Sequence, residues 1–404
     1  MGKLFRAVRT RLRRNKKIYK LLGGIYGVRR NTISALARLR QGIDPNMVLF
    51  CAFEQKSYGD NPRYISEALH RLRPQTDIVW MFDDIAAAKR KYPIPDYVRC
   101  VQTLSKAGYS VTGRARVLVD NYNKRAYIRL KTPEQVYIQT WHGDRAFKKV
   151  GYDIGIPRAK MCEEKYCALG ICGSDYGERQ FRSAFHYKGE IMRCGYPRND
   201  ILVRNDPADE KEIRSRLGVD TDTGILLYAP TFRDSDARGH RAMPVPLNLA
   251  HVLDRLSQKT GKDWICLTRA HYLSYGITAQ GQDARIRSAT DYPEMAELLR
   301  VADALITDYS SCAGDYALLR RPIFLYQNDL ADYVSNSRGL YFDMADSPYW
   351  VADTPDKMDA LIDACTPERA RENCDAILKF YGECESGHAA EQIAEYIIDK
   401  LNEC

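Results

Sequence analysis

The sequence predicts an α/β protein built from two doubly wound domains with parallel sheets. Short apolar strands alternate with helical stretches from residue 47 to residue 139, and a second such series starts at residue 224. This βαβα pattern is typical of parallel sheets covered by helices. Between the two series, Gly195-Tyr196-Pro197-Arg198-Asn199-Asp200 marks a joint, because Gly and Pro interrupt regular structure there. A chain of 404 residues is long enough for two or three domains.

In the first series the apolar runs predict four strands: 47–53, 78–82, 117–120 and 136–139. Helical stretches are expected at 61–73, 85–91 and 104–108. The second series predicts strands at 224–229, 264–267, 304–306 and 323–326, and helices at 207–217, 312–319, 355–365 and 386–401. We therefore expect an arm at residues 1–42, a first domain at 43–200 and a second domain at 201–404.

The N-terminal arm is strongly basic. Residues 1–42 hold 13 Lys or Arg and no Asp or Glu, so the rest of the chain carries a net charge of −4. Apolar residues interrupt the cations at roughly helical spacing: Leu4, Phe5, Val8, Leu12, Ile18, Leu21 and Leu22. This pattern favours a helix lying on an anionic membrane surface, with a nucleic-acid arm and a merely solvated basic face as alternatives. The arm lacks the unbroken apolar run of a signal peptide or a membrane span.

Metal and cofactor sites have little support. The 12 cysteines are scattered, several within apolar runs, which favours reduced thiols. Cys162, Cys167, Cys172 and Cys194 lack the C-x2-C pairing of a zinc site. The Asp234-Ser235-Asp236 triplet is only a weak metal motif. Because P-loop and G-x-G-x-x-G patterns are both missing from the sequence, neither an ATP site nor a nicotinamide site is expected.

An anion site is predicted where the strand 304–306 ends. Thr307-Asp308-Tyr309-Ser310-Ser311 follows it directly, and a helix is expected to begin at once. Hydroxyl groups and unpaired backbone N–H groups at a helix start can hold a phosphate or a diphosphate. The alternative is that Asp308, Ser310 and Ser311 simply cap the helix.

The stretch "LLRVADALITDYSSCAGDYALLRRPIFLYQND" resembles the C-terminal signature of the CDP-glycerol glycerophosphotransferase family, the teichoic acid primases and polymerases. Four more pieces resemble that family in the same order: "TWHGDRAFKKVGYD", "GYPRND", "APTFRD" and "SRGLYFD". They cover roughly residues 135 to 345. The family usually has Thr-Pro after the WHG triplet and His-Pro in a later motif, where this chain has Asp144-Arg145 and His271-Tyr272.

The resemblance implies a GT-B fold, with the two domains facing across a cleft, and often with C-terminal helices that cross back to the first domain. It implies transfer of polyol phosphate from CDP-glycerol to a hydroxyl of a lipid-linked acceptor, with release of CMP. It also implies peripheral attachment to the cytoplasmic face of a bacterial membrane, and no nucleic-acid partner is expected. CDP-ribitol as donor, a GT-B glycosyltransferase or epimerase using a UDP-sugar, and a non-catalytic membrane- or RNA-binding protein are the alternatives.

Two histidines are the candidate catalytic residues. His142 follows the strand that ends near Thr140, and ligands of parallel sheets bind at that edge. A largely neutral imidazole suits a general base that deprotonates the acceptor hydroxyl. By resemblance, His271 contacts the donor phosphates, with Arg269 as a fixed charge beside it. Either histidine could instead be structural, and which of them is the base stays open.

Phosphoryl transfer needs in-line positioning and charge neutralisation. The candidates on the donor side are Arg233, Asp308, Ser310, Ser311 and Arg338. The alternative for the two arginines is an ion pair with Asp234 or Asp343. Lys148 and Lys149 lie in the first domain, so we expect them to meet the anionic acceptor.

Overall fold

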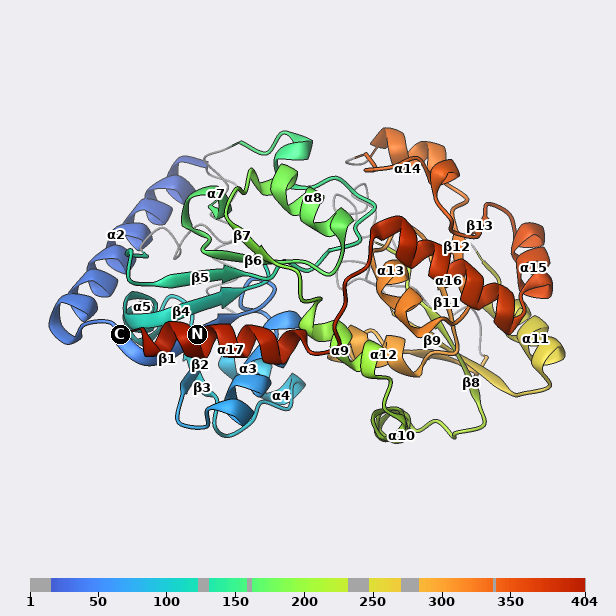
Figure 1. The fold of residues 1–404 in the computed structure, drawn as a ribbon, viewed down its shortest axis with the longest axis horizontal. Helices are drawn as coiled ribbons and strands as arrows, with labels where there is room; N and C mark the ends of the chain where they lie inside the picture. The colour runs from blue at the N-terminus through green and yellow to red at the C-terminus, as the bar shows by residue number, and fades with distance from the viewer. Residues whose placement is uncertain are drawn as a thin grey trace.

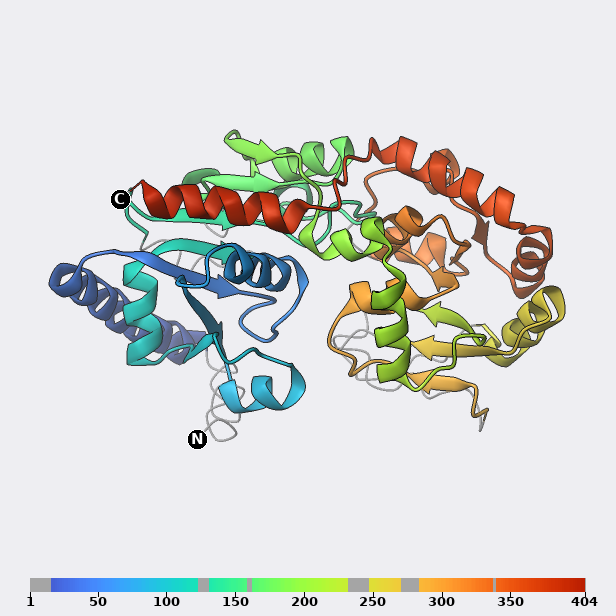
Figure 2. The same ribbon diagram turned by 60° about the horizontal axis from the view of Figure 1, so that its bottom comes forward.

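A computed structural model describes residues 16–122, 131–157, 162–231, 247–269, 283–336 and 339–403. Two α/β domains lie side by side, each with a parallel sheet between helices (Figures 1 and 2). This is the predicted fold class. The core of each domain has two parts, one on either face of its sheet.

The first sheet has seven parallel strands in the order β3-β2-β1-β4-β5-β6-β7. Their bounds are β1 Asp44–Cys51, β2 Asp77–Phe82, β3 Arg99–Gln102, β4 Ala115–Asp120, β5 Val136–Gln139, β6 Leu169–Ile171 and β7 Glu190–Met192. The covering helices include α2 Lys16–Gln41, α3 Asp60–Leu72, α4 Ile85–Lys91, α5 Lys106–Arg114, α7 Glu163–Tyr166 and α8 Asp175–Phe185, and a turn of 3-10 helix, η1, covers Gly151–Ile154. The four predicted strands are β1, β2, β4 and β5. The sequence did not predict β3, β6 and β7, because each is short and contains polar residues or glycine instead of an unbroken apolar run.

The second sheet has six parallel strands in the order β10-β9-β8-β11-β12-β13. Their bounds are β8 Gly224–Tyr228, β9 Trp264–Thr268, β10 Ile286–Ser288, β11 Ala304–Thr307, β12 Ile323–Tyr326 and β13 Val351–Ala352. Its helices are α11 Leu249–Thr260, α12 Met295–Val301, α13 Cys312–Tyr316, α14 Leu330–Asn336, α15 Pro355–Ala364 and α16 Pro367–Tyr381, with short 3-10 turns η5 Ala317–Leu319 and η6 Met344–Asp346.

Each sheet reverses its strand order at one point, between β1 and β4 in the first and between β8 and β11 in the second. At each of these points, an equivalent hydrogen bond links the two loops that follow the neighbouring strands. Phe53 N, after β1, donates to Asn121 Oδ1, after β4, at 2.9 Å. Thr231 N, after β8, donates to Asp308 Oδ1, after β11, at 2.8 Å. Since ligands of open α/β sheets bind at such points, both loops are placed for function.

The chain crosses between the domains twice. The first crossing is η3 Pro197–Asn199 with α9 Asp200–Arg204, followed by α10 Pro207–Leu217. The second is the segment before α17 Ala389–Asn402, which returns along the first domain (Figure 1). Ile393 and Ile397 of α17 are buried in the first-domain core. Asp200 joins the two crossings, because its carboxylate oxygens accept from Ala389 N and Ala390 N, both at 2.9 Å.

Candidate active site

The His142 loop begins at the carboxyl end of β5. Thr140 N donates to Asp120 O at 2.9 Å, which continues the pairing of β4 with β5 beyond the strand. Trp141 then takes a left-handed conformation with φ of 54°. A tryptophan rarely adopts that conformation, and such strain collects at functional sites. The turn sends the chain out of the sheet and places His142 beside the β1–β4 switch point.

The imidazole of His142 is held in one orientation and one tautomer. Its Nδ1 lies 2.7 Å from the backbone carbonyl oxygen of Asn121. Because that oxygen can only accept, Nδ1 carries the proton and the Nε2 lone pair is left to accept another. Burial lowers the pKa of His142 below the usual 6.5, so the neutral form prevails at neutral pH.

Aromatic side chains surround this imidazole. It stacks on Tyr122 with a centroid separation of 5.7 Å, meets Trp141 at 4.2 Å and meets the edge of Phe53 at 5.3 Å. Phe53 begins three consecutive residues with positive φ, followed by Glu54 and Gln55. The strained β1 loop therefore turns a half-exposed phenyl ring toward His142.

In the second domain, Ser310 and Ser311 precede α13. Ser311 is the N-cap residue, yet its side chain makes no capping hydrogen bond. The only capping contact of Ser310 Oγ within this turn is a long one, 3.4 Å from Cys312 N. Both residues are partly exposed. Capping therefore does not account for the two hydroxyls, which favours the anion-site hypothesis.

Asp308 orders the loops beside these serines. Its carboxylate accepts from Thr231 N and from Tyr309 N, and its backbone oxygen accepts from Gln327 Nε2 at 2.8 Å. The side chain is buried. These bonds fix the start of the "APTFRD" segment against the end of β11, and the donor-side role of Asp308 stays a prediction.

Lys148 faces the second domain. Its ammonium lies 5.0 Å from the ring centroid of Tyr333, and that ring stacks on Tyr309 at 3.7 Å. Lys149 N donates to Gly339 O at 3.1 Å, so this segment of the first domain pairs with the chain after α14. The acceptor role of the two lysines stays a prediction, and this geometry places the Lys148 charge against the second domain.

Three predicted site residues, Arg233, His271 and Arg338, lie outside the described residues. Arg269 is described, and its guanidinium donates to the backbone oxygens of Ala289, Thr290 and Tyr292. Its charge orders the loop after β10, a role that the sequence did not indicate.

A buried ionic cluster at the joint also went unpredicted. It consists of Arg145, Arg198, Asp315 and Glu385, and their side chains are at most 8% exposed. Arg145 Nη1 lies 3.1 Å from Asp315 Oδ1 and 3.0 Å from Glu385 Oε1. Arg198 Nη2 lies 2.9 Å from Asp315 Oδ2. The one local signal was Asp315, a carboxylate set within the apolar stretch of α13.

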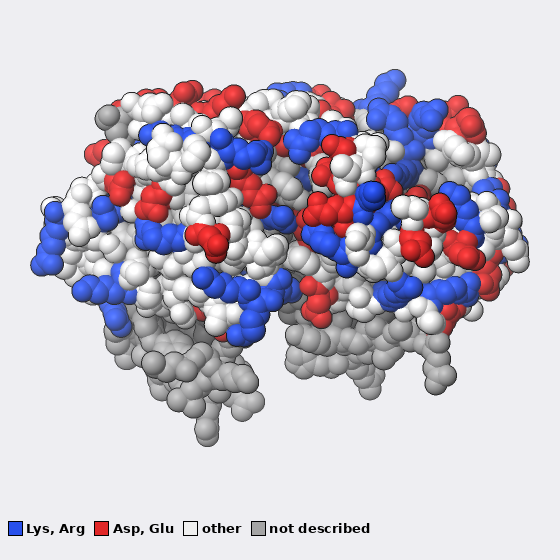
Figure 3. All heavy atoms as spheres, turned by 90° about the horizontal axis from the view of Figure 1, so that it is seen from below, with Lys and Arg blue, Asp and Glu red and all other residues white. Residues whose placement is uncertain are grey.

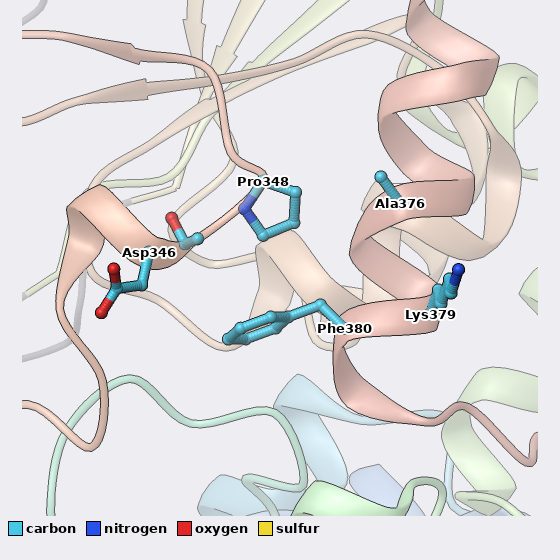
Figure 4. A pocket seen from close by; sticks show the side chains of 6 residues that line it. Asp346, Pro348, Ala376, Lys379 and Phe380 are labelled. Carbon is cyan, nitrogen blue, oxygen red and sulfur yellow. The ribbon is translucent and has the colours of Figure 1, made fainter.

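Within the described ranges, no three His, Cys, Asp or Glu side chains are grouped as a metal site. The 11 described cysteines are free thiols. A pocket of about 450 Å³ lies between the loop after η6 and α16, lined by Asp346, Ser347, Pro348, Ala376, Lys379 and Phe380 (Figure 4). None of these residues belongs to the candidate active site.

Helix α2 confirms a helical segment within the predicted arm, although residues 1–15 lie outside the described residues. Ser34 Oγ donates to Tyr109 O at 2.7 Å and fixes the inner face of α2 on α5. Its outer face exposes Val28, Leu36 and Leu39, with Leu39 79% exposed. No helix in the described part of the chain has the length and apolarity to cross a bilayer. Elsewhere, basic and acidic side chains are interspersed on the face seen in Figure 3.

The chain is similar to enzymes of teichoic acid synthesis. It is 30% identical to a teichoic acid glycerol-phosphate transferase of Staphylococcus aureus, over 87% of this chain and 92% of that protein. It is 29% identical to a teichoic acid poly(glycerol phosphate) polymerase of Staphylococcus epidermidis, over 89% of this chain, but it spans about half the length of that relative (52%).

A structure of the wall teichoic acid polymerase TagF matches with a TM-score of 0.80 and 27% identity, covering 96% of this chain and 97% of the other. A further TagF structure, a variant soaked with CDPG, matches with a TM-score of 0.79 and 28% identity, over 96% of this chain and 98% of the other. The family model for CDP-glycerol:poly(glycerophosphate) glycerophosphotransferases matches residues 33–399. The predicted family and GT-B-like fold are thereby confirmed, and the chain belongs to the CDP-glycerol:poly(glycerophosphate) glycerophosphotransferase family.

Proposed function

We propose that this protein transfers glycerol phosphate from CDP-glycerol to a hydroxyl group of a lipid-linked acceptor and releases CMP. The observation that carries the proposal is His142, whose tautomer is fixed by Asn121 O and whose Nε2 can accept a proton. It lies at the carboxyl edge of the first sheet, and the family activity requires a base for the acceptor hydroxyl. Family membership and the TagF likeness support the donor assignment.

The reaction is an in-line displacement at the phosphorus that bears glycerol. The acceptor oxygen forms a new bond to that phosphorus while its proton moves to His142 Nε2. The bond from this phosphorus to the bridging oxygen breaks, and CMP leaves with that oxygen and its electron pair. The product is a phosphodiester between the acceptor and glycerol.

Ser310 and Ser311 are suited to the donor diphosphate. Ser311 makes no capping hydrogen bond and Ser310 makes only a long one, and both stand at the carboxyl end of β11 beside the switch point of the second sheet. Hydroxyl and backbone N–H donors spread over the equatorial oxygens would stabilise the charge of the transferring group. Lys148 adds a positive charge from the facing domain.

The protein is held at a membrane surface, on the cytoplasmic face, by the outer side of α2 together with the basic N-terminal sequence. Val28, Leu36 and Leu39 lie within one arc of the helix, and Arg29 and Arg40 border it. Apolar side chains in the acyl boundary and cations at the headgroups are the arrangement of a peripheral amphipathic helix. A lipid-linked acceptor would then reach the cleft without leaving the bilayer.

The test is product analysis by mass spectrometry. Purified full-length protein is incubated with a synthetic lipid-linked acceptor and, in separate reactions, CDP-glycerol, CDP-ribitol or a UDP-sugar. The proposal expects an acceptor that gains glycerol phosphate, with CMP released in equal amount. Transfer from CDP-ribitol alone would replace the donor assignment. Transfer from a UDP-sugar, with both CDP-polyols inert, would overturn the proposed function.

A further inference from the structure

Arg198 connects three segments that meet at the domain joint. Its guanidinium donates to the backbone oxygen of His142 at 3.0 Å, to Asp60 Oδ2 at 3.0 Å and to Asp315 Oδ2 at 2.9 Å. The side chain is buried, and Arg198 N is itself held by Asn61 Oδ1 at 3.2 Å. One planar group therefore ties the peptide of the candidate base to a carboxylate of the opposite domain.

Asp315 is the partner on the donor side. It lies on α13, the helix that starts directly after Ser310 and Ser311. Besides Arg198, it accepts from Arg145 Nη1 and from Asn199 Nδ2, both at 3.1 Å. Burial alone would raise its pKa, yet the guanidinium groups of Arg198 and Arg145 hold the pKa of Asp315 below its usual value. A charged carboxylate with three fixed donors leaves α13 little freedom to shift.

Close packing also restrains α13, at Gly314. A Cβ placed on Gly314 would lie 2.6 Å from Arg145 Cδ and 2.8 Å from Arg145 Cβ. Only glycine allows the Arg145 side chain to pass this close to the helix. The His142 loop and the donor helix are therefore held through the same few atoms.

We propose that the Arg198–Asp315 ion pair is a positioning device that sets the placement of the His142 base relative to the donor phosphate. This inference rests on the proposed function. Both residues act through the segments they hold, so they are positioning residues and not catalytic ones. In-line transfer is sensitive to alignment, since a misplacement of about 1 Å can cost about 10²-fold in rate.

The competing explanation is that the Arg198–Asp315 ion pair only stabilises the fold. Glu385, in the same cluster, offers a control for that explanation. Glu385 has a buried side chain and accepts from Arg145 and Asn199, as Asp315 does, but in the described part of the chain it makes no hydrogen bond to Arg198 or to His142 itself. Burial raises the pKa of Glu385 to about 7, so glutamine closely imitates its accessible neutral form. Glu385→Gln therefore perturbs the same cluster without touching the proposed device.

The experiment compares wild type, Asp315→Asn and Glu385→Gln, with three measurements on each: turnover with CDP-glycerol, the dissociation constant of CDP, and the melting temperature. Asp315→Asn should lower kcat about 10- to 100-fold while the CDP dissociation constant stays within about threefold. Glu385→Gln should keep kcat within about threefold even where its melting temperature falls as far as that of Asp315→Asn.

Three outcomes overturn the inference: unchanged kcat in Asp315→Asn, equal losses of kcat in the two variants, or a loss of CDP affinity as large as the loss of kcat. If Asp315→Asn does not fold, Arg198→Lys takes its place, because one ammonium cannot reach three acceptors that a guanidinium fork spans. The same limits on kcat and CDP affinity then apply. An inactive wild type would refute the proposed function instead, which keeps the two failures distinct.

Discussion

Replacement of His142 by glutamine tests the base directly. Glutamine keeps a polar side chain of similar length but cannot take the proton from the acceptor hydroxyl. A general base contributes about 10²- to 10⁴-fold, which corresponds to about 3 to 5 kcal/mol of transition-state stabilisation. Among the described residues the imidazole bonds to Asn121 O alone, so we expect the loss in kcat to exceed any loss of stability.

The pH profile gives a second, independent readout of the same variant. The neutral imidazole is the active form, and burial lowers the pKa of His142 below 6.5. Wild-type kcat/KM should therefore stay level as the pH falls to 6.5 and decline only below it, by about tenfold per pH unit. His142→Gln should lack this decline.

The matched control is His251→Gln, the same substitution at an exposed histidine of α11 that pairs with Asp359. It should retain wild-type turnover. The assignment of His142 as base fails if His142→Gln keeps turnover within tenfold of wild type, or if its acid limb matches that of wild type. A melt that collapses in His142→Gln alone would favour a structural histidine.

Three further predictions follow from the structure. Ser310→Ala with Ser311→Ala should weaken CDP binding about 10- to 100-fold, measured by calorimetry, because each hydroxyl donates to a charged group; unchanged affinity would return the pair to capping. Asp200→Ala should lower the unfolding free energy of the first domain by about 3 kcal/mol in denaturant titrations, because α17 loses two charge-assisted bonds, and Asp200→Asn should recover part of it. Leu39→Glu should reduce co-sedimentation with anionic liposomes about tenfold or more, while Leu72→Glu, at 47% exposure on α3, should not; equal binding by both variants would contradict a membrane-facing α2.

Elements with clear end signals were predictable. Helix α10 begins and ends as expected because Asp206 caps it, Pro207 is its first residue and Gly218 closes it in a left-handed conformation. Strand β12 is a buried apolar run that stops at its predicted ends. Helix α16 has equivalent signals, with Thr366 as cap, Pro367 next and Gly382 at the end, but its polar sequence drew no prediction. Strand β13, with two residues, is too short to show a period.

Some residues of the candidate site could likewise be predicted from the sequence, and others could not. His142, Ser310 and Ser311 could be picked out because each follows a predicted strand, and strand ends converge at one edge of a parallel sheet. The pairing of Arg145 with Asp315 joins positions 170 residues apart, and nothing local in either segment indicates the other. Single-sequence patterns report local periodicity and end signals, so contacts across a domain joint are beyond their reach.

Asp144 and Arg145 stand where the family usually has Thr-Pro. Their contacts indicate a role in holding the domain joint together rather than in binding the acceptor. Asp144 accepts from Gly173 N at 2.9 Å and from Ser174 Oγ at 2.6 Å, which fixes the turn before α8. Arg145 neutralises Asp315 and Glu385, two carboxylates that would otherwise be buried with less compensation. Removing one partner of a buried pair typically costs about 3 to 5 kcal/mol, so Arg145 is tied to the carboxylates around it. The two residues next to the candidate base therefore serve the domain joint that holds the base in place.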